Sequence, residues 1–430
     1  MALTQLAPGA AAPGRERLEH LGAAAEAQRH VLAINAGSSS LKAALFNAGA
    51  EQALLLAVSV ERIGGAEGRI RIRDGHGTTL AESAGQVRDY NAALTALFAA
   101  LGTYQALERL SAVGHRVVHG GPGHWQPQSV TPALVASLRK LVPLAPDHMP
   151  QALAGIDHVR REYPALEQVA CFDTAFHRSL PPAARMFALP QALHDAGIIR
   201  YGFHGLSYES IVHQLRAADA TAAQGRIIVA HLGNGASMAA IAAGCCVDTT
   251  MGYTPNSGLM MGTRSGDIDP GVLIHLLTDK ALTPAALVAL LEEQSGLLGV
   301  SGSSSDMRDL LAAEATSPRV AAALDLFCYR AKKYLGALAA VLGGLDTLVF
   351  TGGIGEKAAP IRERICAGLE FLGIELDPAA NRDHAPVISR LESAVSVRVI
   401  PTNEEAMIAR DTSELLGLQQ TRGRSGNARV

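Results

Sequence analysis

The sequence is poor in aromatic residues, in net charge and in long apolar runs, and each shortage removes a class of function. Aromatic residues are 4% of the 430 residues, and Trp125 is the single tryptophan, which argues against a base-stacking platform for nucleic acid. The formal net charge is −3, so no basic field attracts nucleic acid or an anionic membrane. No segment reaches the ~18 uninterrupted apolar residues that a membrane span needs. We therefore expect neither nucleic acid nor a membrane as a partner.

Cysteine is also scarce, and its five positions show no CxxC motif and no histidine-paired metal spacing. An odd, scattered set is typical of buried free thiols in a reducing compartment, which predicts a cytoplasmic protein. Residues 1–29 lack the apolar core of a secretory signal and are expected to form a disordered N-terminal extension. Residues 419–430 are polar and are expected to form a flexible tail.

What the chain does contain is three apolar strands that run into glycine-rich turns. They are Val-Leu-Ala-Ile-Asn-Ala-Gly-Ser-Ser-Ser from residue 31, Ile-Ile-Val-Ala-His-Leu-Gly-Asn-Gly from residue 227, and Leu-Val-Phe-Thr-Gly-Gly-Ile-Gly from residue 348. Glycines at a strand end let backbone N–H groups approach an anion closely. One such turn is a weak signal, but three along one chain favour a large polyanion such as a nucleoside triphosphate.

Length and internal similarity indicate two domains. A chain of 430 residues, 48% of them hydrophobic, is long enough for two packed cores. The first two glycine turns resemble each other, which predicts two similarly folded α/β domains facing a cleft. We expect an N-terminal domain over 30–174, completed by about 405–418, and a C-terminal nucleotide-binding domain over 175–404.

Hydrophobic periodicity and proline or glycine boundaries predict the secondary structure between the motifs. Helices are expected over 90–110, 132–142, 150–162, 270–278, 284–293 and 318–342. Strands are expected over 31–36, 41–45, 70–74, 112–119, 168–172, 227–231, 239–242, 347–350 and 395–400. Residues 351–356 and the polar stretch 296–308 are expected to be loops.

Arg116 and Arg264 are candidate anion-binding residues because both lie among glycines. A guanidinium presents a rigid fork of donors that suits carboxylate or phosphate oxygens. The alternative is a structural ion pair, and Asp267 or Asp269 could pair with Arg264 and hold it in place.

Asp173 and Glu404 each follow an apolar strand, where ligands of open α/β sheets bind. A carboxylate there suits Mg²⁺, which keeps most of its waters and uses few protein ligands. Asp173 could instead cap a turn, and Glu404 could be a first-turn helix acid favoured by the helix dipole.

His204 lies in Tyr-Gly-Phe-His-Gly and could donate to a phosphoryl oxygen. The 296–308 stretch could contact a ribose or adenine, and Asp306 could at the same time cap the next helix.

Taken in order, these motifs resemble the acetate kinase family, within the larger group that includes sugar kinases, heat-shock chaperone ATPase domains and actin. The resemblance runs from Val31 to about Leu416 and rests on NAGSSSLK, GHRVVHGG, FDTAFH, YGFHG, HLGNGAS, MGTRSGDIDP, SGLLGVSGSSSDMR, TGGIGE and PTNEE. It implies two actin-like (ribonuclease H-like) α/β domains flanking a nucleotide cleft, and a homodimer. It also implies reversible Mg²⁺-dependent phosphoryl transfer from ATP to acetate, giving acetyl phosphate and ADP, with Mn²⁺ as an alternative metal.

The resemblance also assigns roles to residues. Asn35 and Glu404 are implied in metal binding, Arg116 in binding the acyl substrate, and Asp173, His204 and Arg264 in catalysis. Val118, Phe203 and Pro255 would line the small acyl pocket. Nucleotide contacts are implied for Lys42, His231, Leu232, Gly233, Asn234, Gly235, Asp306, Met307, Arg308, Gly353, Ile354, Gly355, Glu356 and Lys357.

Several positions depart from the family pattern. Asp147 and Met149 stand in a segment that usually reads LAPLHNP, where the replaced leucine helps line the acyl pocket. A buried, unpaired Asp147 would be costly, so it must pair, point away or meet a polar substrate. The remaining departures are Asn256 and Ser257 in the usual TPLEG, Tyr208 where histidine is usual, and Lys357 where asparagine is usual.

Two other functions stay open. Propionate or another short-chain acid is an alternative substrate, because one methylene changes binding by only ~1–3 kcal/mol. An actin-like or chaperone-like ATPase without an acceptor is a different class, but it has no need of Arg116 beside Arg264.

Overall fold

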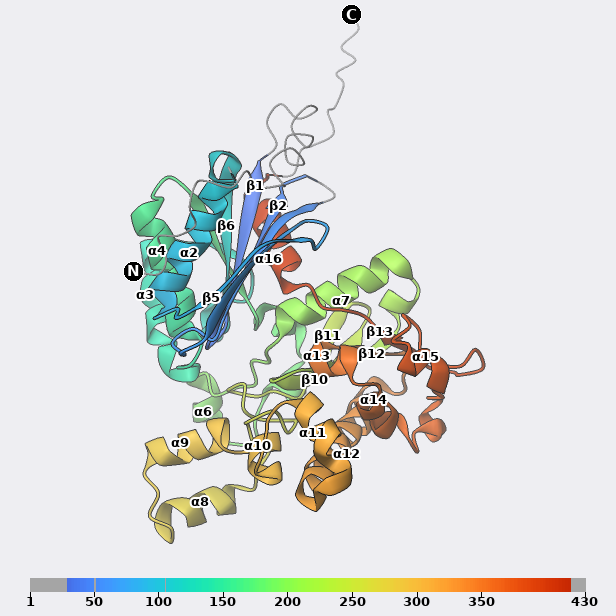
Figure 1. Ribbon diagram of the computed structural model, residues 1–430. Helices are drawn as coiled ribbons and strands as arrows, with labels where there is room; N and C mark the ends of the chain where they lie inside the picture. Colours follow the sequence, from blue (N-terminus) through green and yellow to red (C-terminus); the bar gives the residue numbers. More distant parts are fainter. Residues whose placement is uncertain (1–28, 50–51, 105, 419–430) are drawn as a thin grey trace, which may run out of the picture. The chain divides into compact units, whose positions relative to one another are not determined.

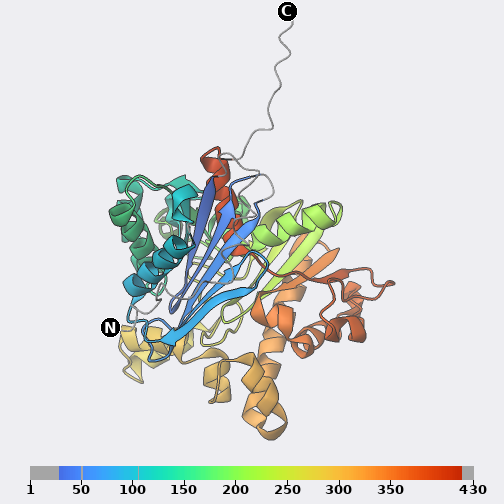
Figure 2. The same cartoon turned by 45° about the horizontal axis from the view of Figure 1, so that its top comes forward.

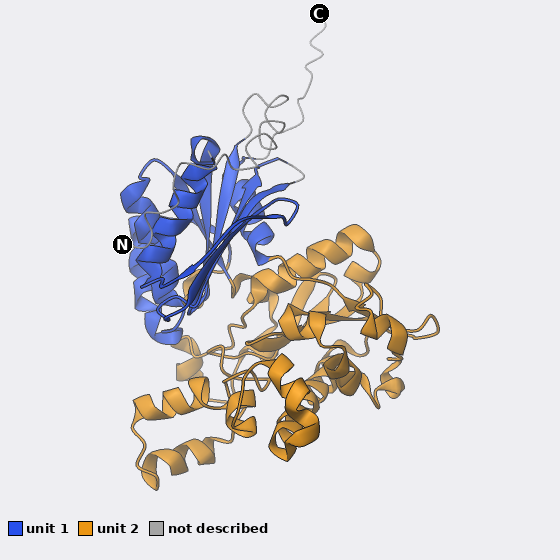
Figure 3. Ribbon diagram, in the orientation of Figure 1, with its two compact units in different colours: residues 1–120, 126–172, 404–430 blue, residues 121–125, 173–403 orange. Residues whose placement is uncertain are grey.

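The computed structural model describes residues 29–49, 52–104 and 106–418, so most of the expected N-terminal extension and the whole expected tail lie outside the described residues. The chain forms two compact units, shown in Figure 3. Unit 1 comprises residues 1–120, 126–172 and 404–430, and unit 2 comprises residues 121–125 and 173–403. Each unit is built around one β-sheet.

The sheet of unit 1 has eight strands in the order β5-β4-β3-β2-β1-β6-β8-β7. Its centre is β1 (His30–Ala36), which pairs antiparallel with β2 (Ser40–Asn47) and parallel with β6 (Leu110–Val117). β6 pairs parallel with β8 (Glu167–Phe172). The other strands are β3 (Leu54–Glu61), β4 (Gly68–Asp74), β5 (Thr79–Gly85) and β7 (Gln128–Ser129).

Helices cover both faces of this sheet, with α2 (Tyr90–Thr103) and α4 (Met149–Glu162) on one face and α16 (Glu404–Leu415) on the other, as Figures 1 and 2 show. α3 (Pro132–Lys140) packs beside α4. Side chains alternate along a strand, so Leu32 and Ile34 of β1 join Leu94 and Leu97 of α2 in one core. Gly114 of β6 lets α16 approach closely, because a Cβ there would lie 2.3 Å from Thr412 Oγ1.

The sheet of unit 2 has five strands in the order β11-β10-β9-β12-β13. Its centre is β9 (Arg226–Leu232), which pairs antiparallel with β10 (Ala236–Ala242) and parallel with β12 (Thr347–Thr351). The edges are β11 (Cys245–Thr249) and β13 (Ser396–Val399). α7 (Gly205–Ala218) packs its buried Tyr208 and Ile211 against Ile227 and Val229 of β9.

The other helices of unit 2 include the 25-residue α12 (Pro318–Leu342), which packs on β9 and β10 and ends at Gly343 in a left-handed conformation. The remaining α-helices are α5 (Pro182–Arg185), α6 (Gln191–Asp195), α8 (Pro270–Thr278), α9 (Pro284–Glu293), α10 (Gly296–Ser301), α11 (Met307–Ala313), α13 (Gly352–Lys357), α14 (Ala359–Cys366) and α15 (Pro378–Arg382). No helix in the described part of the chain is long and apolar enough to cross a membrane.

The two sheets repeat one arrangement. The order β3-β2-β1-β6-β8 in unit 1 matches β11-β10-β9-β12-β13 in unit 2, with the same antiparallel and parallel pairings along each row. The resemblance between the first two glycine turns therefore reflects equivalent positions, since each follows the central strand of its sheet.

Three sequence predictions are corrected. The helix expected over 90–110 ends at Thr103, because the chain must turn before Leu110 begins β6. The loop expected at 351–356 is mostly helix α13, since Gly352 alone makes the turn, at a φ of 77°, and the residues after it are helical. The loop expected at 296–308 contains α10 and the start of α11.

Candidate active site

The predicted site residues are distributed over both units. Unit 1 carries Asn35, Lys42, Arg116, Val118 and Glu404, and unit 2 carries the rest.

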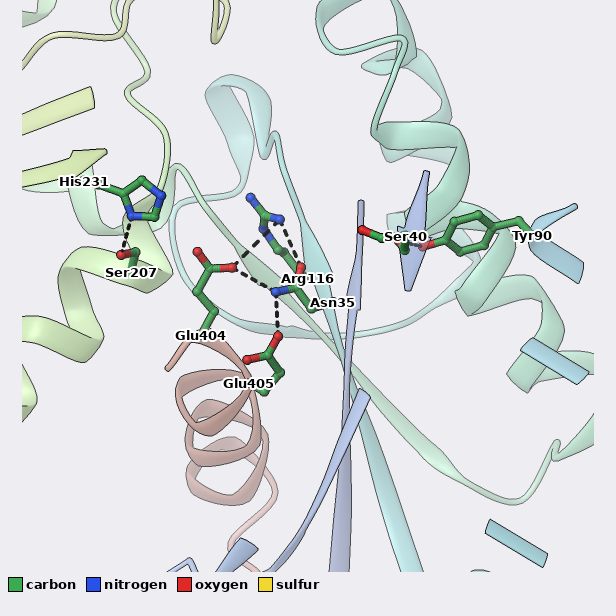
Figure 4. A network of polar contacts seen from close by, with 8 residues as sticks. All are labelled: Asn35, Ser40, Tyr90, Arg116, Ser207, His231, Glu404 and Glu405. Atoms are coloured by element: carbon green, nitrogen blue, oxygen red, sulfur yellow. Dashed lines mark hydrogen bonds and ion pairs between the residues drawn. The ribbon is translucent and has the colours of Figure 1, made fainter. Parts of the chain in front are cut away.

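Asn35 is the centre of a polar cluster in unit 1 (Figure 4). Its Nδ2 donates to Glu404 Oε2 and to Glu405 Oε1, each at 2.9 Å, and its Oδ1 accepts from Arg116 Nη1 at 3.0 Å. Arg116 Nη1 lies 3.9 Å from Glu404 Oε2, and both side chains are mostly buried, at 14% and 12% exposed. The structure thus brings together three residues that the sequence predicted separately, the two proposed metal residues and the proposed acyl-binding arginine.

The fold explains why these residues meet. Asn35 is near the end of β1, Arg116 is near the end of the parallel strand β6, and the carboxyl ends of parallel strands lie at one edge of a sheet. Glu404 and Glu405 begin α16, where the helix dipole stabilises negative charge. Lys42 is directly opposite Asn35 across the β1–β2 pair, so its side chain leaves the same face of the sheet.

The first glycine turn is held by Tyr90. The Tyr90 hydroxyl donates to the carbonyl oxygen of Ser40 at 3.0 Å, and that oxygen also accepts from the N–H of Gly37 at 2.8 Å. Burial raises the pKa of Tyr90, so the hydroxyl remains a donor. A side chain from α2 therefore fixes the turn between β1 and β2.

In unit 2, His204 is held in a left-handed backbone conformation, with φ 58°. It immediately precedes α7, and the N–H of Gly205 donates to the carbonyl oxygen of Asp173 at 2.9 Å. Glycine is required at 205, because a Cβ there would lie 2.0 Å from that oxygen. A non-glycine residue in this conformation carries strain of about 1–3 kcal/mol, which is typical of functional positions.

His177 fixes the segment before His204. Its Nε2 lies 3.0 Å from the carbonyl oxygen of Phe203, and its Nδ1 lies 3.2 Å from Cys246 Sγ. Burial lowers the pKa of His177 to about 4, so the ring is neutral. Since a carbonyl can only accept, Nε2 carries the hydrogen, and Nδ1 is the unprotonated nitrogen beside the Cys246 sulfur. This buried contact sets the backbone position of Phe203, a predicted acyl-pocket residue.

His204 and Arg264 converge on Gly235. A Cβ built on Gly235 would lie 3.3 Å from His204 Nε2 and 3.8 Å from Arg264 Nη1. The His204 ring also stacks on His231, with centroids 4.2 Å apart and an interplanar angle of 22°. Two proposed catalytic residues and the glycine turn after β9 thus surround one small region within unit 2.

The second and third glycine turns also lie together. β9 and β12 are parallel neighbours, and a Cβ on Gly352 would lie 2.7 Å from the carbonyl oxygen of Leu232. A Cβ on Gly233 would lie 3.9 Å from the N–H nitrogen of Gly353. The two turns therefore lie at one edge of the sheet, where the N–H of Gly233 donates to the carbonyl oxygen of Gly235 at 2.9 Å.

Some predicted nucleotide residues have structural contacts of their own. Asp306 caps α11 by accepting from the N–H of Arg308 at 2.8 Å, and it also pairs with the exposed Arg308 side chain. Glu356 accepts from the N–H of Gly352 at 3.1 Å, and Met307 is buried. Lys357 is exposed, whereas Leu232 and Ile354 are buried.

The aspartates expected near Arg264 are used elsewhere. Asp267 accepts from the N–H of Gly258 at 2.7 Å and from the Tyr334 hydroxyl, and Asp269 caps α8 by accepting from Gly271 at 2.6 Å. Asp147 is exposed, so its charge bears none of the cost of an unpaired buried carboxylate.

Sequence reasoning missed three polar residues. Glu405 contacts Asn35 as closely as Glu404 does. Ser207 Oγ is 2.8 Å from His231 Nδ1, and Ser237 Oγ is 2.8 Å from His204 Nδ1. Ser237 could have been found from the sequence. Strands were expected over 227–231 and 239–242, and extending the second strand back by two residues pairs Ser237 with His231. Ser207 and Glu405 gave no separate signal.

The repeated sheet, with its glycine turns at the carboxyl ends of parallel strands, defines a two-unit α/β protein of the actin-like type. A family model described as the acetokinase family matches residues 30–410, and the chain belongs to that family.

Relatives and solved structures agree with this assignment. An acetate kinase of Methylocella silvestris is 46% identical over 398 residues, which cover 90% of this chain and 98% of the relative. An acetate kinase of Rhodopseudomonas palustris is 47% identical over 386 residues, covering 88% and 96%. The crystal structure of Porphyromonas gingivalis acetate kinase has a TM-score of 0.81 at 39% identity and covers 90% of this chain and 100% of that one. A propionate kinase from Francisella tularensis has a TM-score of 0.83 at 35% identity, covering 90% and 99%.

Proposed function

We propose that this protein catalyses the reversible transfer of a phosphoryl group from ATP to acetate, giving acetyl phosphate and ADP. The convergence of His204 Nε2 and Arg264 Nη1 on the Gly235 turn carries the proposal. These groups can stabilise negative charge on the phosphoryl group during its transfer, and Arg116 can bind the acceptor carboxylate. The names of the curated relatives support acetate as the acceptor.

The chemistry needs no general base. Acetate is already ionised at pH 7, because its pKa is close to that of a glutamate side chain. The barrier is the approach of one anion to another, which Arg116, Arg264 and His204 reduce by charge and hydrogen bonding. Asp173 is therefore proposed to orient a cation or a guanidinium rather than to abstract a proton.

The residues around Asn35 fit a magnesium ion. Glu404 and Glu405 supply hard oxygen donors side by side, held by the amide of Asn35. Mg²⁺ keeps most of its waters and uses few protein ligands, so two adjacent carboxylates are enough to hold it. Mg²⁺ when bound would offset phosphate charge, and Asn35 and Glu404 would hold it directly or through water, with Mn²⁺ as an alternative.

The nucleotide is proposed to bind along the glycine turns of unit 2, with residues 231–235 and 353–357 near its phosphates and residues 306–308 near its nucleoside. Lys42 of unit 1 would contact the phosphates. Val118 of unit 1 and Phe203 and Pro255 of unit 2 are each proposed to contact the acyl group of the substrate.

Propionate is the alternative acceptor, and the likeness to a propionate kinase structure favours testing it. Purified protein with Mg-ATP, hydroxylamine and acetate should give acyl hydroxamate, with the highest kcat/KM for acetate among acetate, propionate and butyrate. A higher value for propionate would correct the substrate, and no hydroxamate from any of the three acids would overturn the proposal. ATP hydrolysis at the same rate without an acid would favour an acceptor-independent ATPase.

A homodimer in the cytoplasm is proposed as the working form. Helices α8 and α9 form a pair with large apolar side chains in solvent, since Val272, Ile274, Leu277 and Val288 are 42%, 60%, 38% and 49% exposed. Such a surface is typical of a contact between subunits. All five cysteines are free thiols, which favours a reducing compartment.

Light scattering during gel filtration tests the dimer. The wild type should elute with twice the chain mass, and Ile274→Asp should shift it toward the monomer. Leu391→Asp, at a fully exposed leucine outside this helix pair, should leave the mass unchanged. A monomeric wild type would contradict the proposal.

A further inference from the structure

Tyr208, Ser237 and His204 form a chain of hydrogen bonds inside unit 2. Tyr208 lies on α7 and is fully buried, and its hydroxyl is hydrogen-bonded to Ser237 Oγ. Ser237 lies on β10, and its Oγ is 2.8 Å from His204 Nδ1. The side chain of one helix is thereby connected, through one strand, to a ring at the Gly235 turn.

The direction of each of these hydrogen bonds can be assigned. Burial raises the pKa of Tyr208, so its hydroxyl keeps its proton. Within the described residues the acceptor for that proton is Ser237 Oγ, and a buried hydroxyl without an acceptor is unfavourable. Ser237 therefore accepts from Tyr208 and donates its own proton to His204 Nδ1.

This order decides the tautomer of His204. A neutral imidazole has one N–H and one acceptor nitrogen, so an accepting Nδ1 requires the hydrogen on Nε2. Nε2 is the ring nitrogen nearest Gly235, a residue that Arg264 Nη1 also approaches. The relay of hydrogen bonds from Tyr208 through Ser237 to His204 therefore places the Nε2–H donor, rather than a lone pair, where the second glycine turn is expected to hold phosphate.

The surroundings also favour a neutral ring. His204 stacks on His231 at 4.2 Å, and the Arg264 guanidinium lies on the same side of the Gly235 turn. A charged His204 ring would place a second positive charge at the turn that the guanidinium approaches, and its protonated Nδ1 would leave the Ser237 proton without its acceptor. A neutral donor avoids both costs.

We propose that Tyr208 is a positioning residue which, through Ser237, holds neutral His204 in the Nε2–H tautomer and so presents a hydrogen-bond donor to the transferred phosphoryl group. The part of this inference that concerns phosphoryl transfer rests on the function proposed above. The tautomer itself is a property of the free protein. A purely structural role would make Tyr208 only a member of the core that packs α7 on β9.

The tautomer can be measured directly in protein labelled with ¹⁵N-histidine. Long-range ¹H–¹⁵N correlation spectra distinguish an Nε2–H ring from an Nδ1–H ring, and the spectrum of His204→Gln assigns the resonance. The wild type should show His204 as Nε2–H. A wild-type His204 in the Nδ1–H form would overturn the proposal without any assay of activity.

Tyr208→Phe then tests the relay, since it removes the hydroxyl and keeps the ring. The Nδ1–H form of His204 should become populated, and kcat should fall about 10-fold with unchanged KM for ATP and acetate, because a misplaced tautomer mainly affects turnover. Ser237→Ala should have the same effect on the spectrum, and it provides the test if Tyr208→Phe does not fold. Tyr163→Phe, at a tyrosine stacked on Phe98 in unit 1, should change neither the His204 spectrum nor kcat.

The outcomes separate the two proposals. A His204 spectrum that is identical in wild type, Tyr208→Phe and Ser237→Ala would overturn the relay, whatever the activity. A wild type that forms no acyl phosphate would overturn the proposed function, while the spectra would still decide the tautomer.

Discussion

The guanidinium of Arg362, on α14, donates to the carbonyl oxygen of Gly355, in the short helix α13 that follows the third glycine turn, at 2.9 Å. The same Nη1 is 3.0 Å from the carbonyl oxygen of Glu356, while Nε and Nη2 donate to the side chain and backbone oxygens of Asn381 at 2.8 and 2.7 Å. Arg362 is fully buried, and all of these partners are neutral. Burial lowers its pKa to about 10, so it remains charged at pH 7. The Arg362 guanidinium thus binds carbonyl oxygens at the C-terminal end of α13.

Replacing Arg362 with Lys should loosen α13 and weaken ATP binding. Lysine keeps the charge but not the fork of donors, so some of the carbonyl oxygens of α13 and α15 lose their partners. We expect KM for ATP to rise about 10-fold, equivalent to ~1.4 kcal/mol, with KM for acetate unchanged. Arg364→Lys on the same helix, where the side chain pairs with Glu314, is the control. Equal changes in both KM values would show general damage to unit 2 instead.

Arg264→Ala should lower kcat by ~10³-fold, as expected for an arginine that stabilises a phosphoryl transition state. The KM values should change much less, because the interaction strengthens only as charge develops. Steady-state kinetics with both substrates measures this, and Arg390→Ala, at a residue whose Nε donates to Leu376, is the control. Turnover near the wild-type value would exclude the assigned role.

Much of the fold could be predicted because the central strands are buried on both faces. Residues 227–230 and 348–350 are continuous apolar runs, and they lie within β9 and β12. The edge strand β5 was not predicted, because its sequence Thr-Leu-Ala-Glu-Ser-Ala-Gly has little alternation and it owes its structure to pairing with β4. The helix α13 was missed because its three glycines suggested a loop.

The site was predictable only as a set of separate motifs. Asn35 and Arg116 are 81 positions apart, and Glu404 is 369 positions from Asn35, so the sequence alone could not give their contacts. The parallel pairing of β1 with β6 and the position of α16 bring them together. The direction of the Ser237 hydrogen bond and the tautomer of His204 depend on the partner of a buried hydroxyl, which no linear motif encodes.

Glu404→Gln should raise the Mg²⁺ concentration needed for half-maximal activity by ~10-fold or more, in the range found when metal-site partners are changed. The amide keeps the shape of the side chain but removes a negative charge beside Asn35 and Arg116. Glu405→Gln should have a smaller effect, because Glu405 contacts Asn35 alone in this cluster. Titration of Mg²⁺ at fixed ATP measures both variants.

Glu414→Gln provides the control for this experiment, since Glu414 is an acid near the other end of α16 that pairs with Arg410. An unchanged Mg²⁺ requirement in Glu404→Gln would remove Glu404 from the metal site. A larger effect at Glu405 than at Glu404 would assign the cation to the carboxylate that sequence reasoning missed.

The free energy of unfolding should fall in mild acid because His115 is buried in unit 1. Its side chain is buried in β6, with Nε2 2.9 Å from Gln168 Oε1, and burial lowers its pKa from 6.5 to about 4. Between these two values the unfolded chain binds a proton that the folded protein does not, so the free energy of unfolding falls as the pH falls. At pH 5.5 the loss from this one group is about 1.4 kcal/mol relative to neutral pH.

Urea unfolding of wild type and His115→Gln at pH 7.5 and 5.5 measures the effect. His115→Gln keeps a side chain that can bond to Gln168 and removes the titration, so its free energy of unfolding should fall by about 1.4 kcal/mol less than that of the wild type over this interval. Because each protein is measured at both pH values, any change in the free energy of unfolding that does not depend on pH cancels. His76→Gln, in the exposed turn between β4 and β5, should behave as the wild type does. Equal losses in wild type and His115→Gln would mean that the folded protein protonates His115 as readily as the unfolded chain does.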